Sequence, residues 1–250
     1  MSLKSLKKLL LPLAAIALVT VSSSIAKAET FTLTGTNGGQ PFNVTATITQ
    51  SGNQLTVVLT NNIANQQAMD QSISGFSFQI VGHGGSALTI VSQSGRAAIH
   101  SSGTTWNDVG GTSAADALGW SITGSSGTFT LDALGVTGPN GTNPPDETIA
   151  GVPDSTTGST VSYNSANTSL QNDPRQPIIV NSATFVFTVT GLTGTAQFTN
   201  IVFFLGTDGD RFECVNCETI IPEPTSMLLL GTGLIGVAAG VRRRIKQRQL

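Results

Sequence analysis

The middle of the chain, residues 30–212, is dominated by a two-residue alternation of apolar and polar side chains. The stretch FNVTATITQ, residues 42–50, places Phe42, Val44 and Ile48 on one side and polar residues on the other. Because successive side chains of a β-strand point to opposite faces, this pattern predicts half-buried strands and disfavours helix. The same pattern, punctuated by Gly, Asn and Ser, predicts further strands at 53–61, 73–81, 86–93, 119–124, 127–134, 183–191 and 196–206.

This series predicts an all-β fold, an antiparallel β-sandwich with a jelly-roll-like arrangement, over residues 29–212. The turn Ser51-Gly52 predicts a hairpin between the first two strands. One segment, SAADALG at 113–119, suggests a short helix with Ser113 as its N-cap. Residues 137–180 are poor in apolar side chains and rich in proline, so we expect a long solvated loop or insertion there.

The N-terminal segment has the layout of an export signal. Lysines occur early, an apolar stretch runs from Leu9 to Val21, and small residues follow up to Ala26-Lys27-Ala28. This order is typical of a secretory signal peptide, here residues 1–28, with cleavage after Ala28. The alternative is a buried helix or a permanent anchor. With cleavage, the mature chain begins at Glu29 and lies outside the cytoplasm.

Charge is distributed unevenly along the chain. Between residues 29 and 221 there are 3 basic and 13 acidic residues, so the net charge of this part is 3 − 13 = −10. Such a body repels phosphate groups, which excludes nucleic acid as an expected partner.

Most of the remaining positive charge follows a short apolar segment near the C-terminus. Residues 226–241 carry no charge, and as a helix they are about 25 Å long, enough to span a bilayer core with snorkelling flanks. The basic tail 242–250 begins with Arg242, Arg243 and Arg244, which the positive-inside rule keeps in the cytoplasm. The sequence therefore predicts a single C-terminal transmembrane helix that halts export at the inner membrane.

Just before this helix lies the tripeptide Pro222-Glu223-Pro224, whose prolines favour an extended and accessible backbone. Residues 222–250 contain, in this order, a P-E-P tripeptide, a span rich in leucine and glycine, and an arginine cluster. This order resembles the PEP-CTERM sorting signal. The resemblance implies that export machinery and an exosortase of the inner membrane are partners, and that the tail is removed near the tripeptide. It further implies delivery to the cell surface or extracellular matrix of a Gram-negative bacterium that makes exopolysaccharide. The alternative is a tail anchor that stays in the membrane.

The linker 213–221 contains the two cysteines of the chain, Cys214 and Cys217, as CVNC. A redox dithiol belongs at the start of a helix that follows a parallel strand, and a structural metal site needs four ligands. We therefore favour a local disulfide, as expected for an exported chain. Asp208, Asp210 and Glu213 lie just upstream and form a candidate calcium site, although a polar turn is the simpler interpretation.

Several other residues are candidates for chemistry or binding. His83 lies in an HGG sequence, but no G-x-S-x-G nucleophile motif accompanies it. Asp108 and Asp132 are candidates for a glycosidase pair, with His100 as a further catalytic candidate. The aromatic residues Trp106, Trp120 and Tyr163 are candidates for a sugar-stacking surface, although such residues more often belong to a core.

We expect a protein that is not an enzyme and needs no cofactor: an exported surface or matrix component associated with exopolysaccharide or a biofilm. The first alternative is a carbohydrate-binding module or adhesin, with or without calcium. The second is an exported hydrolase.

Overall fold

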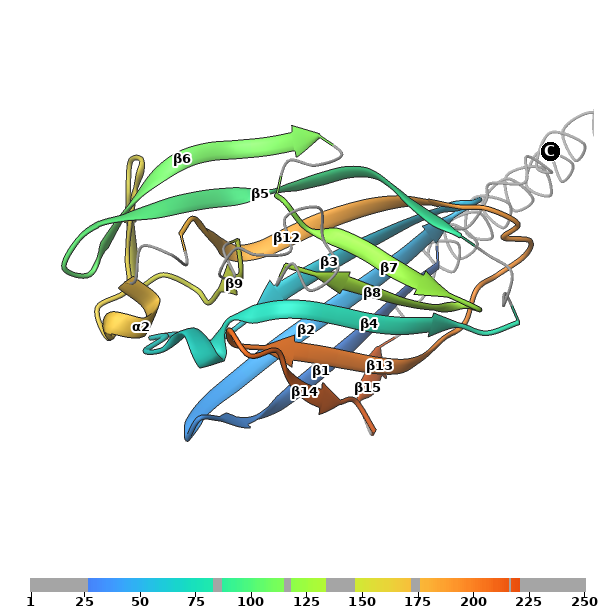
Figure 1. The fold of residues 1–250 in the computed structure, drawn as a ribbon, viewed down its shortest axis with the longest axis horizontal. Coiled ribbons are helices and arrows are strands. Elements are labelled where there is room, and N and C mark those ends of the chain that lie inside the picture. Colours follow the sequence, from blue (N-terminus) through green and yellow to red (C-terminus); the bar gives the residue numbers. More distant parts are fainter. Residues whose placement is uncertain are drawn as a thin grey trace, which may run out of the picture.

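The computed structural model of the protein describes residues 27–82, 87–114, 118–133, 147–171, 176–215 and 217–220. Of these residues 64% lie in strands, and the strands form two packed layers (Figure 1). The all-β sandwich expected from the alternation is confirmed. The elements are β1 (Lys27–Asn37), β2 (Gln40–Ser51), β3 (Gln54–Asn61), η1 (Met69–Gln71), β4 (Ile73–Ile80), β5 (Leu88–Ser102), β6 (Thr105–Ala114), β7 (Ser121–Ser125), β8 (Thr128–Asp132), β9 (Ile149–Ala150), β10 (Ser155–Thr157), β11 (Thr160–Ser162), α2 (Thr168–Gln171), β12 (Ile178–Val189), β13 (Phe198–Leu205), β14 (Asp210–Glu213) and β15 (Glu218–Ile220).

The larger layer has the strand order β10-β11-β6-β5-β12-β3-β2-β1-β15, with antiparallel neighbours throughout. The smaller layer has the order β14-β13-β4-β8-β7 and is also antiparallel. Strand β9 joins the two layers, because it pairs in parallel with β12 and contacts β4 at Ile73 and Ile149. In a jelly roll successive strands cross between sheets, whereas β1, β2 and β3 follow one another in the same sheet. The expected jelly-roll-like order is therefore replaced by meanders and hairpins.

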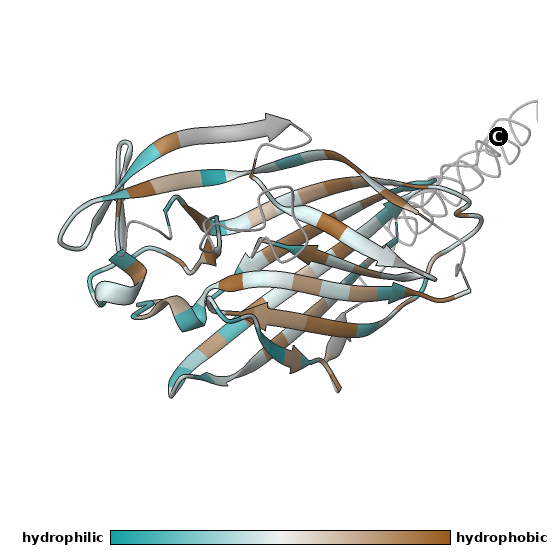
Figure 2. Cartoon of the chain, viewed as in Figure 1, coloured by the Kyte–Doolittle hydropathy of each residue, from teal (hydrophilic) through white to brown (hydrophobic). Residues whose placement is uncertain are grey.

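The core fills the space between the two layers. Every second side chain of β2 and β3 is buried, for example Val44, Ile48 and Val57. Figure 2 shows that the strands of the smaller layer, which face them, are largely apolar. Aromatic rings tie the smaller layer together: Phe76 lies 5.2 Å from Phe203 between ring centroids. Burial of this apolar surface is the main force that stabilises the sandwich.

The segment expected to be a solvated loop, residues 137–180, is folded wherever the structure describes it. Residues 147–171 form β9, β10, β11 and α2, which cover a second apolar cluster around Trp106 and Tyr163. Both rings are fully buried, with centroids 5.2 Å apart, and the Tyr163 hydroxyl donates a hydrogen bond to the Gly151 carbonyl over 2.9 Å. A few well-spaced apolar side chains thus suffice to order a segment of low mean hydropathy.

The helix predicted at 113–119 needs correction, whereas the predicted transmembrane helix and signal peptide stay untested. Ser113 lies in strand β6 and does not cap a helix, since the chain there continues the long β5–β6 ribbon. The predicted transmembrane helix at 226–241 and most of the signal peptide lie outside the described residues. Among the residues that the structure does describe, none forms a helix of the length and apolarity needed to cross a membrane.

Candidate functional site

The candidate functional region is the junction between the sandwich and the C-terminal tail. Strand β15 ends at Ile220 and pairs antiparallel with the first part of β1, with Thr30 opposite Ile220 and Thr32 opposite Glu218. The predicted tripeptide begins two residues after Ile220. Strand β15 thus holds the start of the tail at the edge of the larger sheet.

The predicted signal-peptide cleavage position lies at the same edge. Ala28 belongs to β1, where it pairs with Thr49 of β2, and it is two residues from the partner of Ile220. Cleavage after Ala28 remains a prediction, and it would remove the first two residues of β1. Because the two strand ends are neighbours, both predicted processing positions face the same region of the molecule. Ala26, Pro222, Glu223, Pro224, Arg242, Arg243 and Arg244 lie outside the described residues.

A disulfide connects the two layers just before the junction. Cys214 follows β14 at the edge of the smaller sheet, and Cys217 precedes β15 at the edge of the larger sheet. The two cysteines are disulfide-bonded with a Cα–Cα distance of 5.2 Å, and the Cys214 amide donates to the Ile201 carbonyl over 2.9 Å. The bridge therefore closes the tight corner at which the chain changes sheets.

A cleft of about 650 Å³ lies beside this corner. Phe31, Phe198 and Ile201 are almost fully buried among its lining residues, so part of its wall is apolar. The ion pair between Arg211 and Glu213 also lines it, with both side chains more than half exposed.

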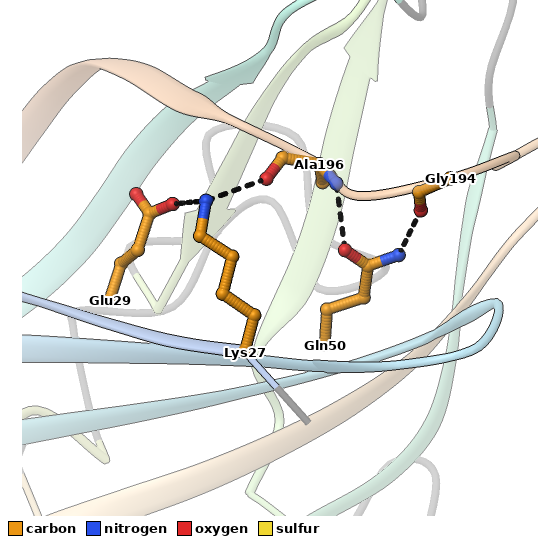
Figure 3. Close-up of polar contacts among 5 residues, drawn as sticks. All are labelled: Lys27, Glu29, Gln50, Gly194 and Ala196. Atoms are coloured by element: carbon orange, nitrogen blue, oxygen red, sulfur yellow. Dashed lines mark hydrogen bonds and ion pairs between the residues drawn. The ribbon is translucent and has the colours of Figure 1, made fainter. Parts of the chain in front are cut away.

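A cluster of polar side chains holds residues 194–196 beside the start of β1 and the end of β2 (Figure 3), and the predicted cleavage after Ala28 would remove Lys27 from it. The Lys27 ammonium pairs with the buried carboxylate of Glu29 and donates to the Ala196 carbonyl. The Gln50 amide donates to the Gly194 carbonyl over 2.7 Å and accepts from the Ala196 amide over 2.7 Å. Sequence reasoning missed this cluster. The available signal was Gln50 itself, a polar residue at the next inward position after Phe42, Val44, Ala46 and Ile48.

The calcium candidates do not converge. Asp208, Asp210 and Glu213 are exposed on the turn and strand that follow β13, and Glu213 is paired with Arg211. Among the described residues there is no group of three or more acidic, cysteine or histidine side chains placed to hold a metal ion.

The aromatic candidates for sugar stacking are buried, which excludes them as an exposed platform. Trp106 and Tyr163 belong to the second cluster, and the Trp120 indole, 3% exposed, packs on Phe185 and donates to the Glu147 carbonyl. Burial raises the pKa of the Tyr163 phenol well above its ordinary value; nearby Arg96 opposes this shift and Asp154 adds to it.

The catalytic candidates lie on separate elements and have local partners. The Asp108 carboxylate of β6 accepts a charged hydrogen bond from Arg96 over 2.7 Å. His100 of β5 contacts the Gly103 carbonyl through Nε2 and packs against Trp106. Asp132 lies on β8 of the smaller sheet, opposite Gly75. His83 is outside the described residues.

The fold and the junction together define a class: a β-sandwich domain whose last described strand is followed in the sequence by the predicted sorting segment. Residues 221–244 match the family model described as the PEP-CTERM protein-sorting motif. The chain therefore carries a PEP-CTERM protein-sorting motif, and this motif indicates an exported protein with a membrane-anchored precursor that an exosortase processes. No curated protein and no solved structure matches the chain.

Proposed function

We propose that the mature protein is a non-catalytic component of the cell surface or extracellular matrix of a Gram-negative bacterium, where it associates with exopolysaccharide. The observation that carries the proposal is the boundary at Ile220: the sorting motif begins at residue 221, immediately after the last described strand ends. Removal of the tail near Pro222 would therefore leave every described element of the sandwich with the released protein.

Two features support a structural role. The candidate catalytic groups Asp108 and His100 are engaged by Arg96 and Gly103, and the large aromatic side chains serve the two cores. The disulfide suits an oxidising compartment outside the cytoplasm. It also braces the corner from which the tail departs, so the sandwich would survive the cut as a folded unit.

The test is fractionation of the producing cells with tail variants. The double variant Pro222→Ala/Glu223→Ala should accumulate as a longer precursor in the inner-membrane fraction, whereas the unmodified protein should be found at the surface in shortened form. Glu218→Gln, which changes a side chain in β15 just outside the matched segment, is the control and should be processed normally. Equal distribution and equal mass of the tail variant and the unmodified protein would refute the proposal.

A further inference from the structure

The outer face of the larger sheet differs from an ordinary protein surface. On β1, β2, β3 and the second half of β12, alternate side chains point away from the core and are partly or fully exposed. We call this surface the threonine face, because most of its members are threonine: Thr30, Thr32, Thr34, Thr45, Thr47, Thr49, Thr56, Thr60, Thr184 and Thr188, interspersed with Asn43, Val58, Ser182 and Val186.

The strand register aligns these side chains in rows across the sheet. One row runs from Thr30 through Thr47 and Val58 to Thr184. The next runs from Thr32 through Thr45 and Thr60 to Ser182. Neighbouring strands lie about 4.8 Å apart and alternate residues of one strand about 6.7 Å apart, so the hydroxyls form a two-dimensional array with these repeats.

Within these four strands the threonine face carries no charged side chain; beyond their edge, Glu218 of β15 is in register with Thr32. The two charged residues of β1, Lys27 and Glu29, occupy inward positions and pair with each other in the full chain; the predicted cleavage after Ala28 would remove Lys27 and leave Glu29 at its inward position. Soluble domains usually place charge on about a quarter to a third of their surface positions, which keeps sheets from associating. The absence of outward charge on four neighbouring strands favours contact with an uncharged partner.

We propose that the threonine face binds chains of a neutral polysaccharide. This inference deepens the proposed association with exopolysaccharide and rests on it. Each threonine hydroxyl both donates and accepts hydrogen bonds, as sugar hydroxyls do, and its methyl group offers an apolar contact to sugar C–H groups. The Thr30–Thr47 and Thr32–Thr45 hydroxyl pairs, at 3.1 and 3.2 Å, hold the array in place and leave part of each oxygen's capacity for a partner.

Other partners fit this face less well. A protein interface of ordinary stability has a core of aromatic or large aliphatic side chains, and this face offers only small ones such as Val58 and Val186. A crystalline surface such as ice requires a flat array, whereas β-sheets twist from strand to strand. A flexible polymer chain can follow that twist.

The experiment is affinity electrophoresis of the purified protein, taken from whichever cell fraction contains it, in native gels. The gels contain dextran, hydroxyethylcellulose or galactomannan as neutral probes, or alginate as a charged probe. We expect at least one neutral polymer to retard the protein. The triple variant Thr47→Val/Thr60→Val/Thr184→Val keeps the shape of the face. Its affinity for the polymer should be at least about tenfold lower, since three hydroxyls are lost. The control is Thr123→Val/Thr156→Val/Thr157→Val, which changes threonines on β7 and β10 and should behave like the unmodified protein.

Three results would overturn the inference: no retardation by any neutral polymer, equal retardation of the triple variant and the unmodified protein, or retardation by alginate alone. Sedimentation of both proteins over a range of concentrations tests self-association. A dimer that the triple variant loses, without polymer binding, would assign the face to a second copy of the chain and overturn the inference. The fractionation experiment is independent of these results, so surface delivery can hold while polysaccharide binding fails, and the reverse.

Discussion

Replacement of Gln50 by alanine tests whether the polar cluster at the start of β1 stabilises the sandwich. The Gln50 side chain is 7% exposed and makes three hydrogen bonds: to the carbonyls of Gly52 and Gly194 and from the amide of Ala196. Water can replace the bonds to Gly52 and Gly194, because both residues are exposed, but Ala196 is fully buried and its amide would lose its partner. An unsatisfied buried donor costs about 1–3 kcal/mol, so we expect a total loss of about 2–3 kcal/mol.

The assay is thermal and urea unfolding of the purified protein followed by circular dichroism. For a domain of this size the expected loss lowers Tm by about 5–10 °C. Gln54→Ala, an exposed position on β3 of the same sheet, is the matched control and should change the free energy of unfolding by no more than about 0.5 kcal/mol. If Gln50→Ala and Gln54→Ala unfold alike, Gln50 does not hold residues 194–196 against β2, and our interpretation of this end of the molecule is wrong.

Three further predictions follow from the packing and the disulfide. Phe203→Ala removes a ring from the centre of the core and should destabilise the protein by about 3–5 kcal/mol in urea unfolding; a loss below about 1 kcal/mol would contradict the packing of the two layers. Cys214→Ser/Cys217→Ser opens a short loop and should cost about 2 kcal/mol, with faster hydrogen exchange confined to the β1–β15 ladder; uniform exchange across the sandwich would argue against a local role. Because burial raises the pKa of Tyr163, the phenol loses its proton at a lower pH in the unfolded chain than in the folded one. The free energy of unfolding should therefore fall as the pH rises above about 10, and Tyr163→Phe should remove this decrease. Because the chain has one tyrosine, absorbance titration of the phenol checks this directly, and ionisation near pH 10 in the folded protein would refute the burial.

The regular strands of the sandwich were predictable from the sequence because burial on one face imposes a two-residue period. The predicted segments 42–50, 53–61 and 73–81 agree with β2, β3 and β4 to within two residues at either end. Strand β1 was not predicted, although Phe31 and Leu33 alternate with polar residues, because its first residues overlap the small-residue end of the predicted signal peptide. Strand β6 was missed because Gly110 and Gly111 interrupt its pattern.

The fate of residues 147–171 was not predictable from local pattern. Their three strands are very short, and what orders them is contact with Trp106 of a distant strand, which no local period encodes. The same reason explains the aromatic candidates: Tyr163 looks like an exposed platform in its own segment and is buried only by its tertiary neighbours. The threonine face is also a property of the tertiary structure, in this case an exposed surface. Each strand shows its own outward threonines, but only the register of four strands reveals a continuous uncharged surface.

The most direct test of the account is the mass of the intact protein recovered from the surface of the producing cells. We predict a chain that begins at Glu29 and ends within a few residues after Ile220, with Cys214 and Cys217 oxidised. In cells without exosortase activity the same analysis should find the tail still attached and the protein in the membrane fraction. A full-length chain of 250 residues free in the cytosol would contradict the account.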